Sequence, residues 1–217
     1  MIKTVLLTGF EPFDGAALNP AWEAVRLLEG WTGEGFRVEV RQLPCVFGAA
    51  IEELAAMVDA LYPDVVIAVG QAGGRAEISV ERVAINVDDA SILDNAGRQP
   101  IDRPIVDGGP AAYFATLPIK ATVAAMRVQG LAAGVSQTAG TFVCNHVFYG
   151  LMHHVAEREG EVKAGFIHVP YLPGQVEGWP DPPPSMALDD IVAGIRIAVE
   201  TAVRVAHDEV HAGGATH

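Results

Sequence analysis

The chain has 217 residues, of which 50% are hydrophobic, and a formal net charge of −13. This length allows one sizeable core and is short for two, so we expect a single domain over residues 1–217 with a loose tail at 212–217. The acidic balance, without any cluster of Lys or Arg, argues against nucleic-acid partners and against docking on an anionic membrane surface.

No apolar run approaches transmembrane length, and the apolar start of the chain is too short for a secretory signal. The two cysteines, Cys45 and Cys144, are too few for a disulfide framework. We therefore expect a protein of the reducing cytoplasm, where cysteines remain thiols.

Hydrophobic periodicity predicts alternating strands and helices. Strands are expected at residues 2–8, 36–43, 64–70, 78–88, 135–139 and 163–170, and helices at 20–28, 47–61, 117–130, 144–159 and 187–211. This alternation predicts an α/β fold, a three-layer α/β/α sandwich around a mainly parallel sheet. Residues 78–88 have too little chain before them for a crossover helix, so this strand should run antiparallel to its neighbour and make the sheet mixed.

Two glycine-rich loops follow the first and third expected strands, at the edge where open α/β sheets bind ligands. The first loop carries Phe10 and Phe13, which either pack beneath the loop or line a pocket. The second loop, residues 70–74, lacks the Lys-Ser/Thr pair of a P-loop and the glycine spacing of a dinucleotide fold. Nucleotide binding is therefore disfavoured there.

Glu81 stands on an apolar face of its expected strand, which it shares with Val83 and Ile85. A carboxylate in such surroundings needs a partner that stabilises its charge. One interpretation is a structural ion pair with Arg75 or Arg82, and the other is a role in a catalytic site.

Cys144 follows a turn that begins at Gly140 and lies in the first turn of an expected helix, where free N–H groups and the helix dipole favour a thiolate. The competing interpretation is a packing residue on the apolar stripe of that helix. His168 ends a buried strand at the same rim of the sheet. Cys144, His168 and Glu81 thus supply the thiol, the imidazole and the orienting carboxylate that a cysteine hydrolase needs.

Four segments carry a resemblance to a known family: GFEPFDG at 9–15 with Asn19-Pro20 after it, ISVERVAIN at 78–86, SQTAGTFVCNH at 136–146 and IHVP at 167–170. They resemble the signature segments of type I pyroglutamyl peptidase, the pyrrolidone-carboxylate peptidase family, and they span essentially the whole chain. The resemblance implies a thiol protease, an omega-peptidase that removes an N-terminal pyroglutamyl residue from small peptides. It implies Cys144 as the nucleophile, His168 as the general acid and base, and Glu81 as its orienting partner.

The same resemblance implies a binding site for the lactam ring. Phe10, Phe13 and Phe142 would form an apolar slot, and Gln71 and Val143 would hydrogen-bond the lactam amide through backbone groups. A neutral aromatic slot suits a lactam, which has no charged amine. The family resemblance further implies no metal, no cofactor and assembly into a homotetramer.

The segment 89–95 departs from the family pattern, with Ser91 where an arginine is usual and Leu93 where a proline is usual. The change at Ser91 leaves open a non-catalytic or altered-specificity binder of pyroglutamyl peptides. Cys45 stands where threonine or valine is expected, near the pocket, and marks a point of sensitivity to oxidation. A nucleoside phosphorylase-like transferase is a third hypothesis, disfavoured because basic residues are sparse near the glycine loops.

Overall fold

The structure, a computed structural model, describes residues 2–156, 158 and 162–214. Its strands are β1 Lys3–Phe10, β2 Thr32–Gly33, β3 Phe36–Leu43, β4 Val65–Gln71, β5 Ile78–Glu81, β6 Val83–Ile85, β7 Ala112–Phe114, β8 Ala133–Ser136 and β9 Lys163–Val169. Its helices are α1 Pro20–Val25 with the 3-10 turn η1 Arg26–Leu28, α2 Ala49–Leu61, α3 Ile119–Val128, α4 Val143–Ala156, α5 Pro173–Val176 and α6 Leu188–Arg204.

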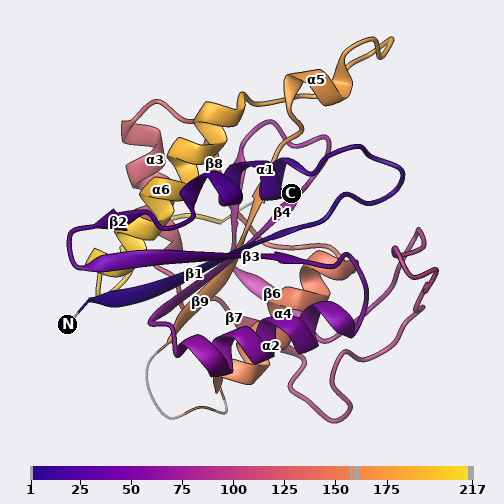
Figure 1. Ribbon diagram of the computed structural model, residues 1–217, viewed down its shortest axis with the longest axis horizontal. Coiled ribbons are helices and arrows are strands. Elements are labelled where there is room, and N and C mark those ends of the chain that lie inside the picture. Colours follow the sequence, from indigo (N-terminus) through magenta and orange to yellow (C-terminus); the bar gives the residue numbers. More distant parts are fainter. Residues whose placement is uncertain (1, 157, 159–161, 215–217) are drawn as a thin grey trace.

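The strands form a seven-stranded sheet in the order β2-β3-β1-β4-β9-β5-β8, and β6 and β7 form a separate two-stranded sheet. Neighbouring β3, β1, β4 and β9 run parallel. β5 pairs antiparallel with β9 and parallel with β8. Helices α1, α3 and α6 cover one face and α2 and α4 the other (Figure 1). The predicted three-layer fold with a mixed, mainly parallel sheet is confirmed.

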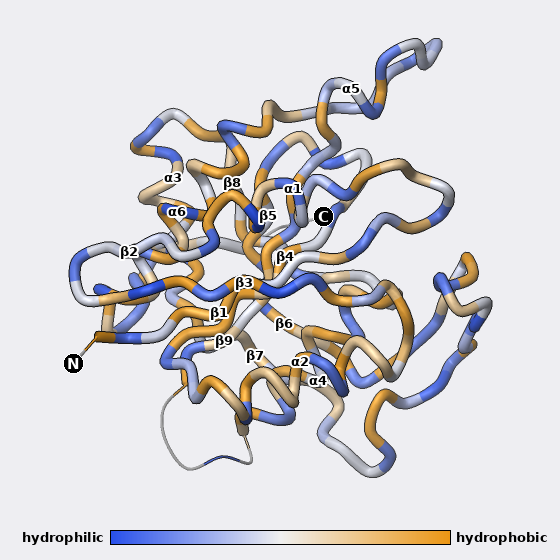
Figure 2. Tube along the Cα trace, viewed as in Figure 1, coloured by the Kyte–Doolittle hydropathy of each residue, from blue (hydrophilic) through white to orange (hydrophobic). Residues whose placement is uncertain are grey.

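Each face of the sheet has its own hydrophobic cluster, because successive strand residues point to opposite faces. On β4, Val65, Ile67 and Val69 join the cluster of α1, α3 and α6. Val66 and Ala68 join the cluster of α2 and α4. The central strands accordingly form the hydrophobic middle of the tube in Figure 2. The same alternation on β9 and β5 turns His168 and Glu81 toward α2 and α4.

The prediction of one continuous strand from Ile78 to Asp88 is wrong. The strand leaves the main sheet after Glu81, because the carbonyl of Arg82 accepts a hydrogen bond from the Ala115 N–H (2.9 Å) outside the sheet. The following β6 pairs with β7 instead. The alternation of apolar and polar residues along this segment is the same on both sides of the point where the chain changes its pairing partner. The sequence pattern therefore could not show where β5 ends and β6 begins.

The C-terminal helix ends at Arg204 rather than near His211. Beyond it, the Asp208 carboxylate accepts hydrogen bonds from the backbone N–H groups of Lys120 (3.1 Å) and Ala121 (2.9 Å) at the start of α3. The chain therefore turns back to cap another helix. The Gly213 carbonyl also accepts a hydrogen bond from Arg82 (3.0 Å).

One further expected strand is shifted, and two expected boundaries fall on residues that the structure does not describe. The strand expected at 135–139 lies at Ala133–Ser136, and the next residues form the turn that leads to α4. The expected end of the cysteine helix at residue 159 and the last tail residues, 215–217, lie outside the described residues.

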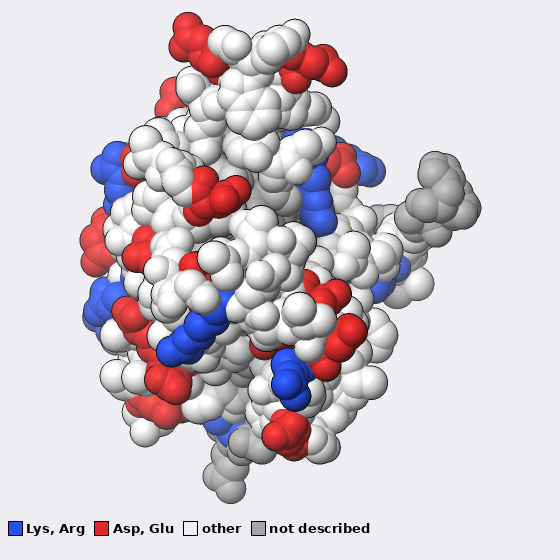
Figure 3. Space-filling model, turned by 90° about the vertical axis from the view of Figure 1, so that its right-hand side faces the viewer, with Lys and Arg blue, Asp and Glu red and all other residues white. Residues whose placement is uncertain are grey.

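The long connections 11–19 and 86–111 lie on the same side of the molecule, to the right in Figure 1. They touch there, since the Asn95 side chain donates to the Pro12 carbonyl (2.9 Å). Figure 3 looks at this side, where acidic and basic side chains are scattered and neither sign gathers in one patch. Among the described helices, none has both the length and the apolarity to cross a membrane.

Candidate active site

Glu81 and His168 meet on the sheet face that α4 covers. His168 on β9 pairs with Ser79 on β5, which brings Glu81 within reach of its imidazole. Nδ1 of His168 lies 2.7 Å from Oε1 of Glu81, with the two side chains 4% and 0% exposed. An ionised carboxylate only accepts hydrogen bonds, so Nδ1 carries the proton and Nε2 is left as an acceptor. This bond fixes the orientation of the imidazole, as a general base requires.

The ion-pair interpretation of Glu81 also holds, with Arg75 as the partner. Nη1 of Arg75 donates to the same Oε1 atom at 2.6 Å. Arg82, the other candidate, donates instead to the side chain of Gln137 (2.8 Å). The buried carboxylate therefore has both a charged partner and the imidazole.

Cys144 is the second residue of α4, and the residue is partly exposed. The turn before it needs Gly140, whose φ of +77° is unfavourable for residues with a side chain. The sulfur lies against β4, since a Cβ built at Gly70 would be 2.8 Å from Sγ. Gly70 is the register partner of His168 on the adjacent strand. The structure therefore brings Cys144, His168 and Glu81 onto one face of neighbouring strands.

Burial controls the protonation of the thiol and the imidazole. It raises the pKa of the Cys144 thiol, an effect to which Glu81 adds and which Arg75 opposes. It also lowers the pKa of His168, although the hydrogen bond to Glu81 acts in the other direction. A position at the start of a helix was expected to favour a thiolate, but desolvation acts in the opposite direction. The resting pair is a neutral thiol and a neutral imidazole.

The start of α4 also offers hydrogen-bond donors beside the sulfur. The intrahelical ladder begins with the N–H of His146, which donates to the Phe142 carbonyl at 3.1 Å. The N–H groups of Val143, Cys144 and Asn145 precede this ladder. Backbone donors in this position suit an oxyanion that forms at the reacting carbon.

Three aromatic side chains form a wall next to Cys144. The ring centroids of Phe13 and Phe142 are 6.1 Å apart, and those of Phe142 and Phe47 are 5.4 Å apart. Phe47 was not among the predicted binding residues, because its segment was assigned to a helix that in fact begins at Ala49. Phe10 is 2% exposed and packs beneath, with its ring centroid 6.3 Å from that of Phe166.

A cavity of about 450 Å³ opens beside this wall, between the loop 13–18 and the segment 171–179. Gln71 lines it, and its side-chain Oε1 accepts a hydrogen bond from Gln175 (2.9 Å). The Val143 side chain is fully buried in the core. Substrate contacts of Phe10, Gln71 and Val143 stay predictions.

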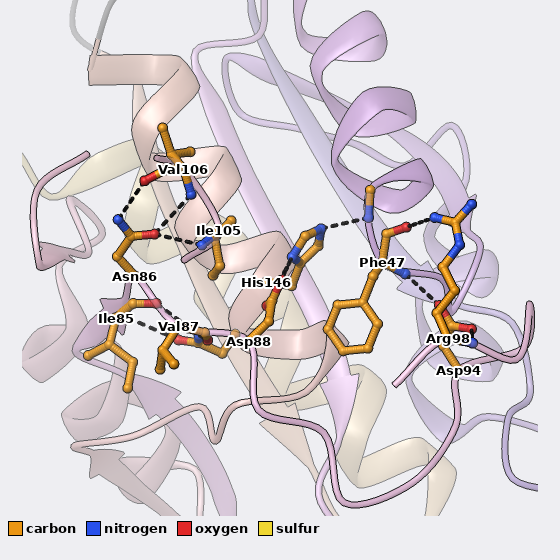
Figure 4. A network of polar contacts seen from close by, with 12 residues as sticks. Phe47, Ile85, Asn86, Val87, Asp88, Asp94, Arg98, Ile105, Val106 and His146 are labelled. Atoms are coloured by element: carbon orange, nitrogen blue, oxygen red, sulfur yellow. Dashed lines mark hydrogen bonds and ion pairs between the residues drawn. The ribbon is translucent and has the colours of Figure 1, made fainter. Parts of the chain in front are cut away.

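A buried pair of Asp88 and His146 lies next to Phe47 of the aromatic wall (Figure 4), and the ring centroids of His146 and Phe47 are 5.2 Å apart. Nδ1 of His146 is 2.8 Å from the Asp88 carboxylate, and Nε2 accepts the backbone N–H of Gly48 at 2.8 Å. Asp94 adds a bond to the backbone N–H of Phe47 (2.9 Å). His146 was not among the predicted site residues, and its acidic partner was placed at the end of an expected strand, so the pair was missed. It holds the turn that carries Phe47.

The two departures from the family pattern have different surroundings. Ser91 is exposed. It lies two residues after Asp89, whose carbonyl accepts a hydrogen bond from the Thr141 hydroxyl (2.7 Å), in the turn before Cys144. Cys45 is only 3% exposed, and burial raises its thiol pKa to about 12. Because Cys45 is buried, it is less open to oxidants than its position near the pocket suggested.

A family model described as pyroglutamyl peptidase matches residues 3–205. The chain belongs to the pyroglutamyl peptidase family. The resemblance drawn from the four sequence segments is thereby confirmed.

Relatives in this family match the chain over its whole length. Pyrrolidone-carboxylate peptidase 1 of Ralstonia nicotianae is 62% identical over 216 residues, which is 100% of each chain. The pyrrolidone-carboxylate peptidase of Cupriavidus necator is 61% identical over 217 residues, also 100% of each.

Solved structures of the family share the fold. The pyroglutamyl peptidase I of Bacillus amyloliquefaciens superposes with a TM-score of 0.95 at 45% identity, covering 98% of this chain and 100% of that chain. A mutant pyrrolidone carboxyl peptidase of the hyperthermophile Pyrococcus furiosus gives a TM-score of 0.90 at 42% identity, covering 92% of this chain and 98% of that chain.

Proposed function

We propose that the protein is a cysteine peptidase that removes an N-terminal pyroglutamyl residue from small peptides, with Cys144 as nucleophile, His168 as general base and acid, and Glu81 as orienting partner. The observation that supports this assignment is the convergence of the three side chains at one sheet face. The bond from His168 to Glu81 measures 2.7 Å, and the Cys144 sulfur lies over the register partner of His168.

The first half of the reaction forms a thioester. Nε2 of His168 takes the thiol proton of Cys144 as the sulfur attacks the pyroglutamyl carbonyl carbon, and the carbonyl oxygen becomes an oxyanion facing the N–H groups at the start of α4. The tetrahedral intermediate collapses when the C–N bond breaks. The imidazolium gives its proton to the leaving amine, and the shortened peptide departs.

The second half regenerates the thiol. A water molecule loses a proton to the neutral His168 and attacks the thioester carbon, and the C–S bond then breaks. The proton on His168 returns to the sulfur, and pyroglutamic acid is released. Because both groups start neutral, proton transfer must accompany the attack of the sulfur rather than precede substrate binding.

The aromatic wall accounts for a preference for the lactam. The faces of Phe13 and Phe142 offer apolar contact to a flat, uncharged ring. A free N-terminal glutamate or glutamine carries an ammonium group that this wall cannot solvate, so its binding costs desolvation without compensation.

Replacement of the nucleophile tests the proposal. We expect Cys144→Ala to abolish release of aminocoumarin from pyroglutamyl-aminocoumarin, while circular dichroism shows an intact fold. Cys45→Ala is the matched control, since its buried thiol should be dispensable, and iodoacetamide should inactivate this variant like the unmodified protein. Activity that survives in Cys144→Ala would contradict the proposal.

The alternative of a non-catalytic binder is not favoured, because Ser91 lies outside the proposed catalytic groups and the relatives of the chain are named as peptidases. We also infer assembly into a homotetramer, as the resemblance implies, and light scattering in solution would reveal a monomer if this is wrong. We infer that the protein is located in the cytoplasm, because the mechanism needs a reduced thiol. Cell fractionation tests this localisation.

A further inference from the structure

Arg75 contacts both the catalytic acid and the turn that leads to the nucleophile. Its Nη1 atom donates to Glu81 Oε1 (2.6 Å), and its Nη2 atom donates to the Thr138 carbonyl (2.9 Å). Nη1 also lies 3.3 Å from the Ser136 hydroxyl. One planar guanidinium therefore bridges β5 and the turn 136–141.

The turn that Arg75 holds is bonded internally and runs directly into α4. The Ser136 hydroxyl donates to the Thr138 carbonyl (3.1 Å), and the Thr138 hydroxyl accepts the N–H of Gly140 (3.1 Å). Cys144 follows within the first turn of the helix. A displacement of Thr138 would therefore also displace the Cys144 sulfur, because only a short, hydrogen-bonded segment separates the two residues.

The Glu81 carboxylate depends on Arg75 for its charge balance. The side chain is fully buried, both of its donors share Oε1, and Oε2 has no hydrogen-bond partner among the described residues. The other donor is the neutral imidazole of His168. Without the guanidinium, a buried negative charge would be left uncompensated.

We propose that Arg75 is a positioning residue of this site, which fixes the Glu81 carboxylate and the nucleophile turn relative to each other. This inference rests on the proposed roles of Glu81, His168 and Cys144. Arg75 does not touch the reacting atoms and acts through its two contacts. Its side chain is 29% exposed, so a small molecule in solution can reach the space it occupies.

The charge of Arg75 also reaches His168. The charged groups that act on this imidazole are Glu81 from β5 and Arg75 from the turn before it. The Cys144 sulfur lies over Gly70, the register partner of His168. Arg75 lowers the pKa of His168 and opposes the rise in the pKa of the Cys144 thiol. Its removal should therefore shift the acid limb of kcat/KM to higher pH and make the thiol less reactive.

The test compares Arg75→Gln and Arg75→Lys with Arg82→Gln. Arg82 is a matched control, because it donates to Gln137 on the same turn but not to Glu81. For Arg75→Gln we expect kcat to fall on the order of tenfold or more with KM nearly unchanged. The acid limb of its kcat/KM profile should move to higher pH by about one unit. Arg75→Lys should restore the pH profile and part of kcat, and added guanidinium should raise kcat of Arg75→Gln.

The rate of Cys144 alkylation by iodoacetamide is a second readout that needs no substrate. We expect slower alkylation in Arg75→Gln than in Arg82→Gln. Wild-type kcat, pH profile and alkylation rate in Arg75→Gln would overturn the inference, as would an equal loss in Arg82→Gln. A wild-type protein that fails to cleave pyroglutamyl substrates would refute the proposed function instead, and the alkylation rates would still decide the role of Arg75.

Discussion

Gly70 carries no side chain at the point where the Cys144 sulfur rests on the sheet. A Cβ at this position would lie 2.8 Å from Sγ and 2.8 Å from the ring of Phe166. Both contacts are closer than atoms tolerate, so the glycine is required by space rather than by backbone conformation. At the scale of single residues, the position of the Cys144 sulfur thus depends on Gly70 having no Cβ atom.

Gly70→Ala should therefore damage activity more than stability. The added methyl group pushes the thiol away from His168, so we expect kcat/KM to fall by about tenfold or more, with a loss of about 1–3 kcal/mol in the free energy of unfolding. Gly165→Ala is the control, since its Cβ would meet Leu117 Cδ1 at 2.6 Å on the opposite face. Urea denaturation and kinetics on both variants separate the two effects, and equal activity losses would contradict the prediction.

Helix α4 is fixed at its start by side chains that bond in different directions. Cys144 rests on β4, and His146 reaches the turn before α2. Asn145, fully buried between them, accepts the N–H of Ile85 (3.0 Å) and donates to the carbonyls of Ile85 (2.9 Å) and Val87 (3.0 Å). The amide side chain thereby acts as a pairing partner for β6, and it joins the small sheet to the helix that carries the nucleophile.

Asn145→Ala should lower the free energy of unfolding by about 2–4 kcal/mol, because it removes three hydrogen bonds from the partly buried backbone groups of Ile85 and Val87. His154→Ala on the same helix serves for comparison. Its bond to Asp59 joins partly exposed side chains and contributes about 0–1 kcal/mol. Denaturant unfolding of both variants measures the difference, and similar losses would show that the Asn145 bonds have little weight.

The molecule as a whole has two cores, and its site lies within the cluster shared by the sheet, α2 and α4. His168, a titratable side chain, is therefore buried in the packed interior. Burial lowers the pKa of His168 below its ordinary value of 6.5. Below pH 6.5 the unfolded chain binds a proton at this position before the folded protein does, so acid favours unfolding.

We expect the free energy of unfolding to decrease as the pH falls from 6.5 through the lowered pKa of His168, and to recover as the pH rises again. His168→Gln, which keeps a donor for Glu81 but does not titrate, should show a smaller slope in this range. Denaturant titrations at several pH values compare the two proteins. The same slope in both would mean that other groups cause the acid destabilisation.

The amino-acid sequence by itself determined the fold class and the family, and it singled out Cys144, His168 and Glu81 as candidates, because hydrophobic period and short motifs are local properties. Only the tertiary structure decided what these residues touch. It chose Arg75 over Arg82, buried Phe10, added Phe47 to the aromatic wall and set Gly70 beneath the sulfur. Such contacts join segments far apart in the chain, and local sequence patterns do not predict which distant segments pack together.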